Sequence, residues 1–141
     1  MRKAVVLTTA LLGLVFLSYS FTSKTTNEMD FGTSYMALSV QDIAASYAFY
    51  QKLGFEQLPG AGGVEQKWMV LKNGEHKLGL FQGMFPKNTM TYNPSDARTI
   101  HKQLVAAGIK VDMASGMDKV EGPCNFMVTD PDRNPILFDQ H

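Results

Sequence analysis

Cysteine is almost absent from this chain of 141 residues, in which Cys124 is the only one. A single cysteine excludes an intrachain disulfide and any zinc site built from several cysteines. We expect Cys124 to be a small buried apolar residue rather than a nucleophile. An excess of charge is also missing, because 13 basic residues balance 13 acidic ones and the two signs are interspersed. This balance predicts no nucleic-acid partner.

Long hydrophobic runs are missing too, except at the N-terminus. Residues 1–3 are positively charged at two positions, residues 4–17 are apolar or small, and residues 18–20 offer small side chains where a signal peptidase cleaves. Residues 1–20 are therefore predicted to be a signal peptide, so that the protein is exported to the periplasm or the cell exterior. The run is short for a membrane span, which needs about 20 residues, but a membrane tether through residues 4–21 remains the alternative.

The remainder of the chain is long enough for one domain with a hydrophobic core. We interpret residues 21–32 as a polar tether, because they lack periodicity, and residues 33–141 as the domain. Gly60 to Gly63 form a glycine cluster without the lysine and helix start of a phosphate-binding loop. The cluster is therefore predicted to be a flexible loop that closes over a site.

One unit of this domain occurs twice. Residues 35–40 alternate as a strand does, and a helix follows from Asp42, its cap, to Leu53, with Gly54 as its stop. The second copy has a strand at residues 90–93 and a helix at residues 95–107 that begins with Ser95 as cap and ends at a glycine. An irregular stretch and two apolar runs follow each helix, so each copy is a strand, a helix and about three strands. The repeat predicts a fold built from two equivalent modules.

These stretches resemble the vicinal oxygen chelate superfamily, which includes glyoxalase I, the bleomycin-resistance proteins and the extradiol dioxygenases. The resemblance covers residues 34–141 and rests on VQDIAASYAFYQKLGF, on the repeat and on the closing DPDRNPILFD. It implies an α+β fold in which two βαβββ modules form a curled mixed sheet around a cleft, with the helices outside.

The usual metal ligands of this superfamily are missing from the sequence. Members that bind a metal hold it with His, Glu or Gln at four strand positions, which correspond here to Tyr35, Gly79, Thr89 and Leu137. Glycine and leucine side chains have no donor atom, whereas a transition metal needs about three nitrogen, sulfur or carboxylate donors. We therefore expect no metal cofactor. The superfamily also has glycine where Arg133 stands, which predicts a strained or altered turn.

A substitute metal site remains an alternative. Asp139 and His141 lie two residues apart and share the cleft face of the last strand, and in this alternative Glu75 or His76 completes the ligand set. We favour the simpler interpretation, in which His141 is an exposed terminal residue and His76 lies on an exposed hairpin.

Strand alternation predicts which residues line the cleft. They are Tyr35, Ala37, Ser39, Gly79, Phe81, Thr89, Thr91, Asn93, Leu137 and Asp139, with Trp68 and Phe126 as neighbours on the remaining strands. This mostly apolar and aromatic set suits a small aromatic or amphipathic molecule. We expect Tyr35, Trp68, Phe81, Asn93, Phe126, Leu137 and Asp139 to contact it, with no assigned catalytic residue. An empty apolar cleft is costly, so a loop of the chain or a partner subunit in a homodimer are other occupants.

Two functional hypotheses follow from the resemblance. The first is a metal-free binding module that holds a small molecule without changing it, as the bleomycin-resistance proteins do. The second is an enzyme of the lactoylglutathione lyase, isomerase or dioxygenase type, which uses either a non-standard metal site or, without a metal, Tyr35 or Asp139 as acid or base. The missing ligands count against the second hypothesis, as does an export signal on a domain whose glyoxalase relatives use a cytosolic glutathione adduct.

Overall fold

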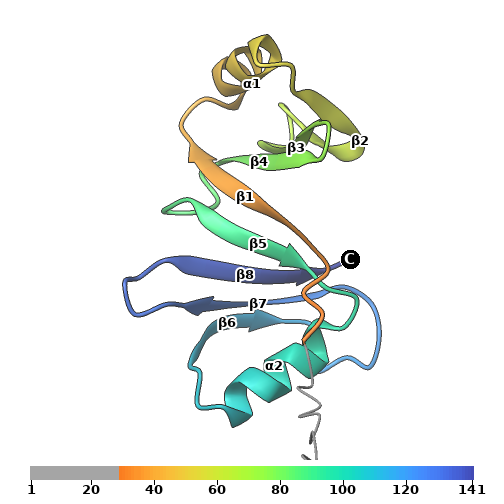
Figure 1. The fold of residues 1–141 in the computed structure, drawn as a ribbon, viewed down its shortest axis with the longest axis vertical. Helices are drawn as coiled ribbons and strands as arrows, with labels where there is room; N and C mark the ends of the chain where they lie inside the picture. The colour runs from red at the N-terminus through yellow and green to blue at the C-terminus, as the bar shows by residue number, and fades with distance from the viewer. Residues whose placement is uncertain (1–28) are drawn as a thin grey trace, which may run out of the picture.

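A computed structural model describes residues 29–141, so the predicted signal peptide and most of the predicted tether lie outside the described residues. Residues 29–141 form an α+β fold with eight strands and two helices (Figure 1). The first half contains β1 (Thr33–Val40), α1 (Ile43–Lys52), β2 (Glu56–Gly63), β3 (Trp68–Asn73) and β4 (His76–Gln82). The second contains β5 (Thr89–Asn93), α2 (Ala97–Ala106), β6 (Val111–Ser115), β7 (Cys124–Thr129) and β8 (Pro135–Gln140).

All eight strands belong to one sheet, in the order β2-β3-β4-β1-β5-β8-β7-β6. This order is symmetric about the antiparallel β1–β5 pair, because β1 pairs in parallel with β4 as β5 does with β8. Met36 lies opposite Leu78 in one half, and Met90 lies opposite Ile136 in the other. The predicted two-module fold is thus confirmed. In Figure 1, α1 packs at one end of the curled sheet and α2 at the other.

Both helices begin and end by the same local chemistry. The side chain of Asp42 accepts a hydrogen bond from the Ala45 amide at 3.0 Å, and that of Asp96 accepts one from the Thr99 amide at 2.9 Å. Asp96, and not the predicted Ser95, is therefore the cap of α2, because the side chain of the residue directly before the helix reaches the orphan amides of its first turn.

A second side chain caps each helix from the sheet. Gln82 Oε1, at the end of β4, accepts from the Ile43 amide at 3.0 Å. Gln140 Oε1 at the end of β8 accepts from the Ala97 amide at 2.8 Å. The two glutamines occupy equivalent places in the two modules, so each module ties its helix to its own last strand.

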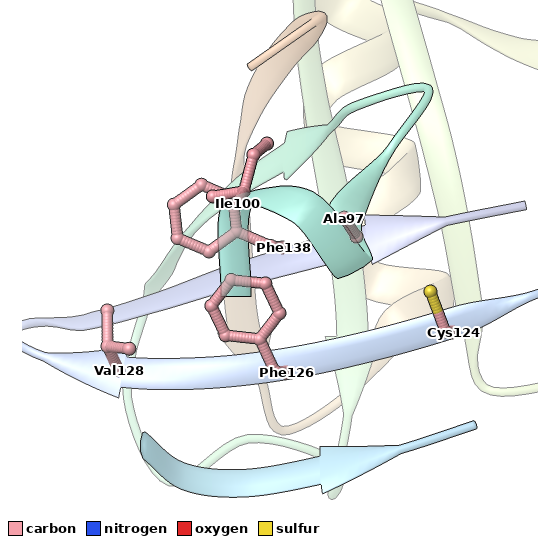
Figure 2. Close-up of a cluster of buried hydrophobic side chains, with 6 residues drawn as sticks. All are labelled: Ala97, Ile100, Cys124, Phe126, Val128 and Phe138. Carbon is pink, nitrogen blue, oxygen red and sulfur yellow. The ribbon is translucent and has the colours of Figure 1, made fainter. Parts of the chain in front are cut away.

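The faces of the sheet that meet the helices form two hydrophobic cores. One core packs against α1 and contains Ile43, Met69, Leu71 and Leu80, as the apolar stripe of that helix predicts. The other packs against α2 and contains Ala97, Ile100, Cys124, Phe126, Val128 and Phe138 (Figure 2). Cys124 is 2% exposed, which confirms the prediction of a buried residue. No helix within residues 29–141 is long and apolar enough to cross a membrane.

Two expectations about segment boundaries need correction. The predicted tether comprises residues 21–32. However, Met29 and Phe31 pack against the α2 core, and the Phe31 ring lies 4.9 Å from that of Tyr92. The glycine cluster is not a flexible loop, because Gly60 to Gly63 belong to β2. A Cβ atom at Gly62 would lie 2.2 Å from the Trp68 carbonyl oxygen, so glycine permits close strand pairing there.

Candidate functional site

The sheet face away from the helices carries a cleft of about 510 Å³. Its lining comes from both modules and consists of Thr33, Tyr35, Leu58, Gly60, Ala61, Trp68, Val70, Lys77, Phe81, Met84, Asn93, Asp139 and His141. Of the seven predicted contact residues, five line it: Tyr35, Trp68, Phe81, Asn93 and Asp139. The cleft is therefore where alternation placed it, between the two modules.

Module one supplies an aromatic wall. Trp68 and Phe81 face each other across the β3–β4 pair, and their rings are 6.2 Å apart and only 14° from parallel. Phe85 packs edge-on against Phe81 at 5.1 Å and holds its ring in place. Two nearly parallel rings give a flat apolar surface on which a planar ligand stacks.

Tyr35 occupies the middle of the cleft because Gly79 makes room for it. A Cβ atom at Gly79 would lie 2.5 Å from the Phe81 ring and 2.9 Å from the Tyr35 ring, closer than real contacts allow. Gly79 sits on β4 next to Ala37 of β1, so the sheet surface below both rings carries only small side chains. At the position that corresponds to a metal ligand in the superfamily, this chain has Gly79, which leaves room for two aromatic rings to pack.

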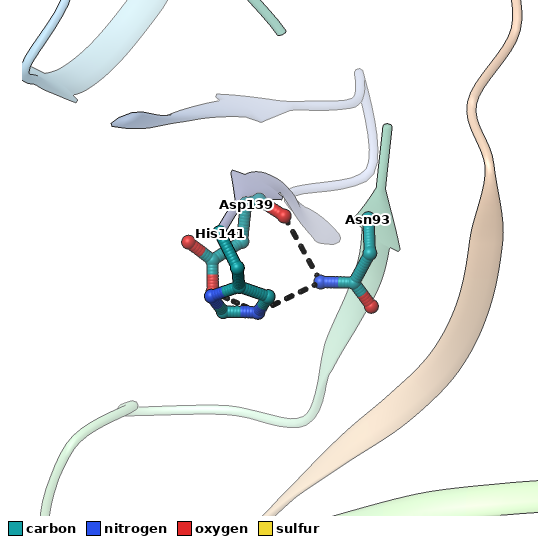
Figure 3. Close-up of polar contacts among 3 residues, drawn as sticks. All are labelled: Asn93, Asp139 and His141. Atoms are coloured by element: carbon teal, nitrogen blue, oxygen red, sulfur yellow. Dashed lines mark hydrogen bonds and ion pairs between the residues drawn. The ribbon is translucent and has the colours of Figure 1, made fainter. Parts of the chain in front are cut away.

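Module two supplies the polar wall (Figure 3). Asn93 Nδ2 donates to the main-chain oxygen of Asp139 at 3.0 Å, and it lies 3.4 Å from His141 Nε2. The His141 nitrogen is in turn 3.6 Å from Asp139 Oδ2. These contacts bring together the ends of β5 and β8 and direct an amide, a carboxylate and an imidazole toward one another.

Burial raises the pKa values of two cleft residues, Tyr35 and Asp139. Desolvation, and secondarily the negative charge of Asp139, raises the pKa of Tyr35 to about 12, so its phenol is protonated at neutral pH. Burial also raises the pKa of Asp139, although His141 and the side chain of Asn125 oppose the shift. The cleft therefore holds a permanent O–H donor beside a carboxylate whose charge is disfavoured.

Two predicted contact residues are placed elsewhere. Phe126 is wrong as a cleft residue, because it is 0% exposed in the α2 core, where its ring stacks on Phe138 at 4.7 Å (Figure 2). Leu137 is on the cleft face, two residues before Asp139, but it is 8% exposed and does not line the cavity. Ala37, Thr89 and Thr91 behave similarly, since they are buried at 0% exposure.

Sequence reasoning missed several lining residues. Thr33 and Lys77 lie two residues before Tyr35 and Gly79, so longer strands would have included both by alternation. Met84 follows β4 in a loop, where no periodicity marks it. Leu58 was missed because the glycine-rich composition of β2 concealed a strand.

The comparisons agree with this architecture. The family model described as Glyoxalase/Bleomycin resistance protein/Dioxygenase superfamily matches residues 32–138. A superfamily member from Vibrio splendidus 12B01 is similar with a TM-score of 0.58 and 18% identity over 77% of this chain and 98% of that one. Methylmalonyl-CoA epimerase from Mycobacterium tuberculosis is similar with a TM-score of 0.57 and 13% identity, over 77% and 87%.

Homoprotocatechuate 2,3-dioxygenase from Brevibacterium fuscum is similar over 76% of this chain but only 37% of that chain, with a TM-score of 0.54 and 16% identity. No curated protein sequence matches significantly. A curled two-module sheet with a cleft defines a glyoxalase-like domain. Since the family model spans most of its length, the chain belongs to the glyoxalase/bleomycin resistance protein/dioxygenase superfamily.

The residues present do not fit the metal that this superfamily implies. The ring of Tyr35 stands over Gly79, in the space that a ligand side chain from that position would need. Leu137 offers no donor atom, and the buried Thr89 hydroxyl donates to the Lys87 carbonyl oxygen at 3.1 Å. Within residues 29–141, no three His, Cys, Asp or Glu side chains gather as a metal site requires, and Glu75 and His76 do not join Asp139 and His141.

Proposed function

We propose that the domain binds a small planar aromatic or amphipathic molecule in the cleft, without a metal and without transforming it. The observation that carries this proposal is the pairing of an aromatic wall, Trp68 and Phe81, with a polar wall, Asn93 and Asp139, across one cavity of about 510 Å³. Cavities of this size and character are typical of small-molecule sites. The lack of fit for a metal at Gly79 and Leu137 favours binding over metal-dependent chemistry.

The test is a screen of aromatic and amphipathic compounds by thermal shift and by the fluorescence of Trp68, the only tryptophan. A bound compound is expected to quench or shift that fluorescence, because the indole lines the cleft. Phe81→Ala is expected to weaken binding by about 1–3 kcal/mol, the usual scale for a lost aromatic contact. Phe49→Ala, at an exposed ring on α1, is the matched control and should leave affinity unchanged. If no compound alters either signal, the proposal fails.

A second candidate is a metal-free enzyme that moves a proton. It is favoured by the half-buried Asp139 carboxylate with its raised pKa, which lies beside His141 and lines the same cleft as the Tyr35 phenol. A carboxylate with a raised pKa is a stronger base than an ordinary one. Deuterium exchange at carbon acids next to a carbonyl, followed by NMR, tests this candidate. Exchange that Asp139→Asn abolishes would support it, and exchange no faster than in buffer would exclude it for those compounds.

We also propose that this domain works outside the cytosol, either exported or tethered through residues 4–21. The proposal is supported by the charged start and apolar run of residues 1–17. N-terminal sequencing of protein from the native host tests it, because a soluble cytosolic form with an intact Met1 would refute it. A homodimer remains a proposal that sedimentation of the purified domain tests.

A further inference from the structure

We propose that Tyr35 and Asp139 select ligands with a planar heteroaromatic ring that carries, on one edge, an N–H group next to a carbonyl group, as in a cyclic amide. The inference rests on the proposed function and names the ligand class for the same cleft. Tyr35 would donate its O–H to the ligand carbonyl, and the Asp139 side chain would accept from the ligand N–H.

The fixed position of the Tyr35 ring is the first step. The ring lies against Gly79, where no Cβ atom fits, and β1 is paired on both sides by β4 and β5. A half-buried ring on the central strands of the sheet has little freedom to turn away. Its hydroxyl is therefore a preorganised donor in the cleft, and a preorganised group loses little entropy when a ligand binds.

The second step is that donor and acceptor are close but do not satisfy each other. Tyr35 and Asp139 line the same cavity, and the negative charge of Asp139 raises the pKa of the Tyr35 phenol, yet among residues 29–141 no hydrogen bond joins the two side chains. The fully buried hydroxyl of Thr91, opposite Tyr35 on β5, has no hydrogen-bond partner among residues 29–141, although its position beside the phenol lowers the pKa of Tyr35. A fully buried hydroxyl is normally paired, so this part of the cleft favours the arrival of an external polar group.

The third step concerns the opposite wall. Asn93 Nδ2 is engaged by the main-chain oxygen of Asp139, so the amide fixes the strand rather than the carboxylate. The Asp139 side chain lies at the cleft, 3.6 Å from the nitrogen of His141, whose side chain is 74% exposed, and beside the Asn125 side chain on β7. The carboxylate therefore remains available as an acceptor beside the Tyr35 donor.

Together these features define the ligand. Its flat body lies on Trp68 and Phe81, and its polar edge meets the donor and the acceptor at once. A ligand that lacks either polar group would leave a buried partner unsatisfied, and such mismatches discriminate more strongly than lost apolar contacts.

The experiment compares three bicyclic probes by isothermal titration calorimetry. 2-Quinolone carries both groups, N-methyl-2-quinolone lacks the N–H, and quinoline lacks the carbonyl. The wild-type protein is expected to bind 2-quinolone about tenfold more tightly than either of the others, the scale of one hydrogen bond. Tyr35→Phe keeps the ring over Gly79 and should remove the preference over quinoline. Asp139→Ala should remove the preference over the N-methyl compound.

Tyr47→Phe is the matched control, because it removes a phenol hydroxyl on α1, away from the cleft lining. It should leave all three affinities unchanged, and circular dichroism of each variant confirms folding. Equal binding of the three probes to the wild type would overturn the inference and leave the proposed function standing. So would a preference that survives in Tyr35→Phe and Asp139→Ala. If none of the probes binds and the aromatic screen is also negative, the proposed function fails and the inference fails with it.

Discussion

At the scale of single residues, the turn before β8 stores backbone strain. Arg133 has a φ of 66°, the left-handed region that costs a residue with a Cβ atom about 1–2 kcal/mol. We predict that Arg133→Gly stabilises the domain by about 0.5–1 kcal/mol, measured by chemical denaturation, because glycine removes the strain but adds entropy to the unfolded chain. Arg133→Ala retains the strain and should be near neutral. Equal stabilisation by both variants would show that the arginine side chain, and not φ, is the cause.

Asp139 provides a second prediction, which concerns pH. Burial raises its pKa in the folded state, so the folded protein binds this proton more tightly than the unfolded chain does. The stability contributed by this group therefore falls as pH rises from the unfolded pKa, about 3.9, through the raised folded value. Asp139→Asn is expected to increase the melting temperature at pH 7 and to leave it unchanged at about pH 3.

Asp130 provides the comparison of opposite sign. Its hydrogen bonds from the side chain and main chain of Asn134 lower its pKa, so its contribution is present above the unfolded pKa and is lost as pH falls through the folded value. Asp130→Asn should therefore lower the melting temperature at pH 7. An increase in the melting temperature of Asp130→Asn would contradict the assignment of Asp130, and a decrease in that of Asp139→Asn would contradict the assignment of Asp139.

The cleft shows how far single residues are predictable. Tyr35 and Asp139 were placed correctly because each lies on a strand whose alternation is clear. Phe126 was placed on the wrong face because residues 126–128 of β7 are all apolar, so this stretch shows no alternation, and its facing is fixed by pairing with Phe138 on β8. The sequence of such a strand shows that its side chains alternate between two faces, but it does not show which face points toward the cleft.

At the scale of elements, the glutamine caps make a third prediction. Gln82→Ala and Gln140→Ala each remove the acceptor of a buried helix N-terminal amide, at Ile43 and Ala97 respectively. Each variant should lower the free energy of unfolding by about 1–2 kcal/mol, the range for an unsatisfied buried amide. Gln51→Ala, on the exposed face of α1, serves as control and should change it little. If the control costs as much as the caps, a general effect of removing a glutamine side chain, and not the loss of a cap, is the explanation.

The elements also show why the fold was accessible from sequence. Aspartate caps and glycine stops at equal spacing mark the two helices, and those local signals do not depend on tertiary packing. β2 was missed because its glycines have low strand propensity, and its pairing with β3 depends on the close approach that Gly62 permits. Pairing with β3, a long-range contact, therefore stabilises β2 despite its low strand propensity.

At the scale of the whole molecule, we predict that the modules unfold together. They share one sheet through the β1–β5 pair, so neither buries its edge strand without the other. Trp68 fluorescence reports on module one, and the reaction of Cys124, 2% exposed, with a thiol reagent reports on module two. The two signals should have the same denaturant midpoint. A thiol that becomes reactive while Trp68 remains native would show independent modules.

The two modules are arranged symmetrically in the sheet, but their cleft walls carry different side chains. This difference determines the orientation in which a ligand binds. The Trp68–Phe81 pair on β3 and β4 stands at the place that Asn125 and Asp139 occupy on β7 and β8. Two identical modules would bind an asymmetric molecule equally well in two orientations, related by the twofold rotation that exchanges the modules. Because one wall stacks and the other forms hydrogen bonds, that degeneracy is removed, and a bound molecule has a single preferred direction in the cleft.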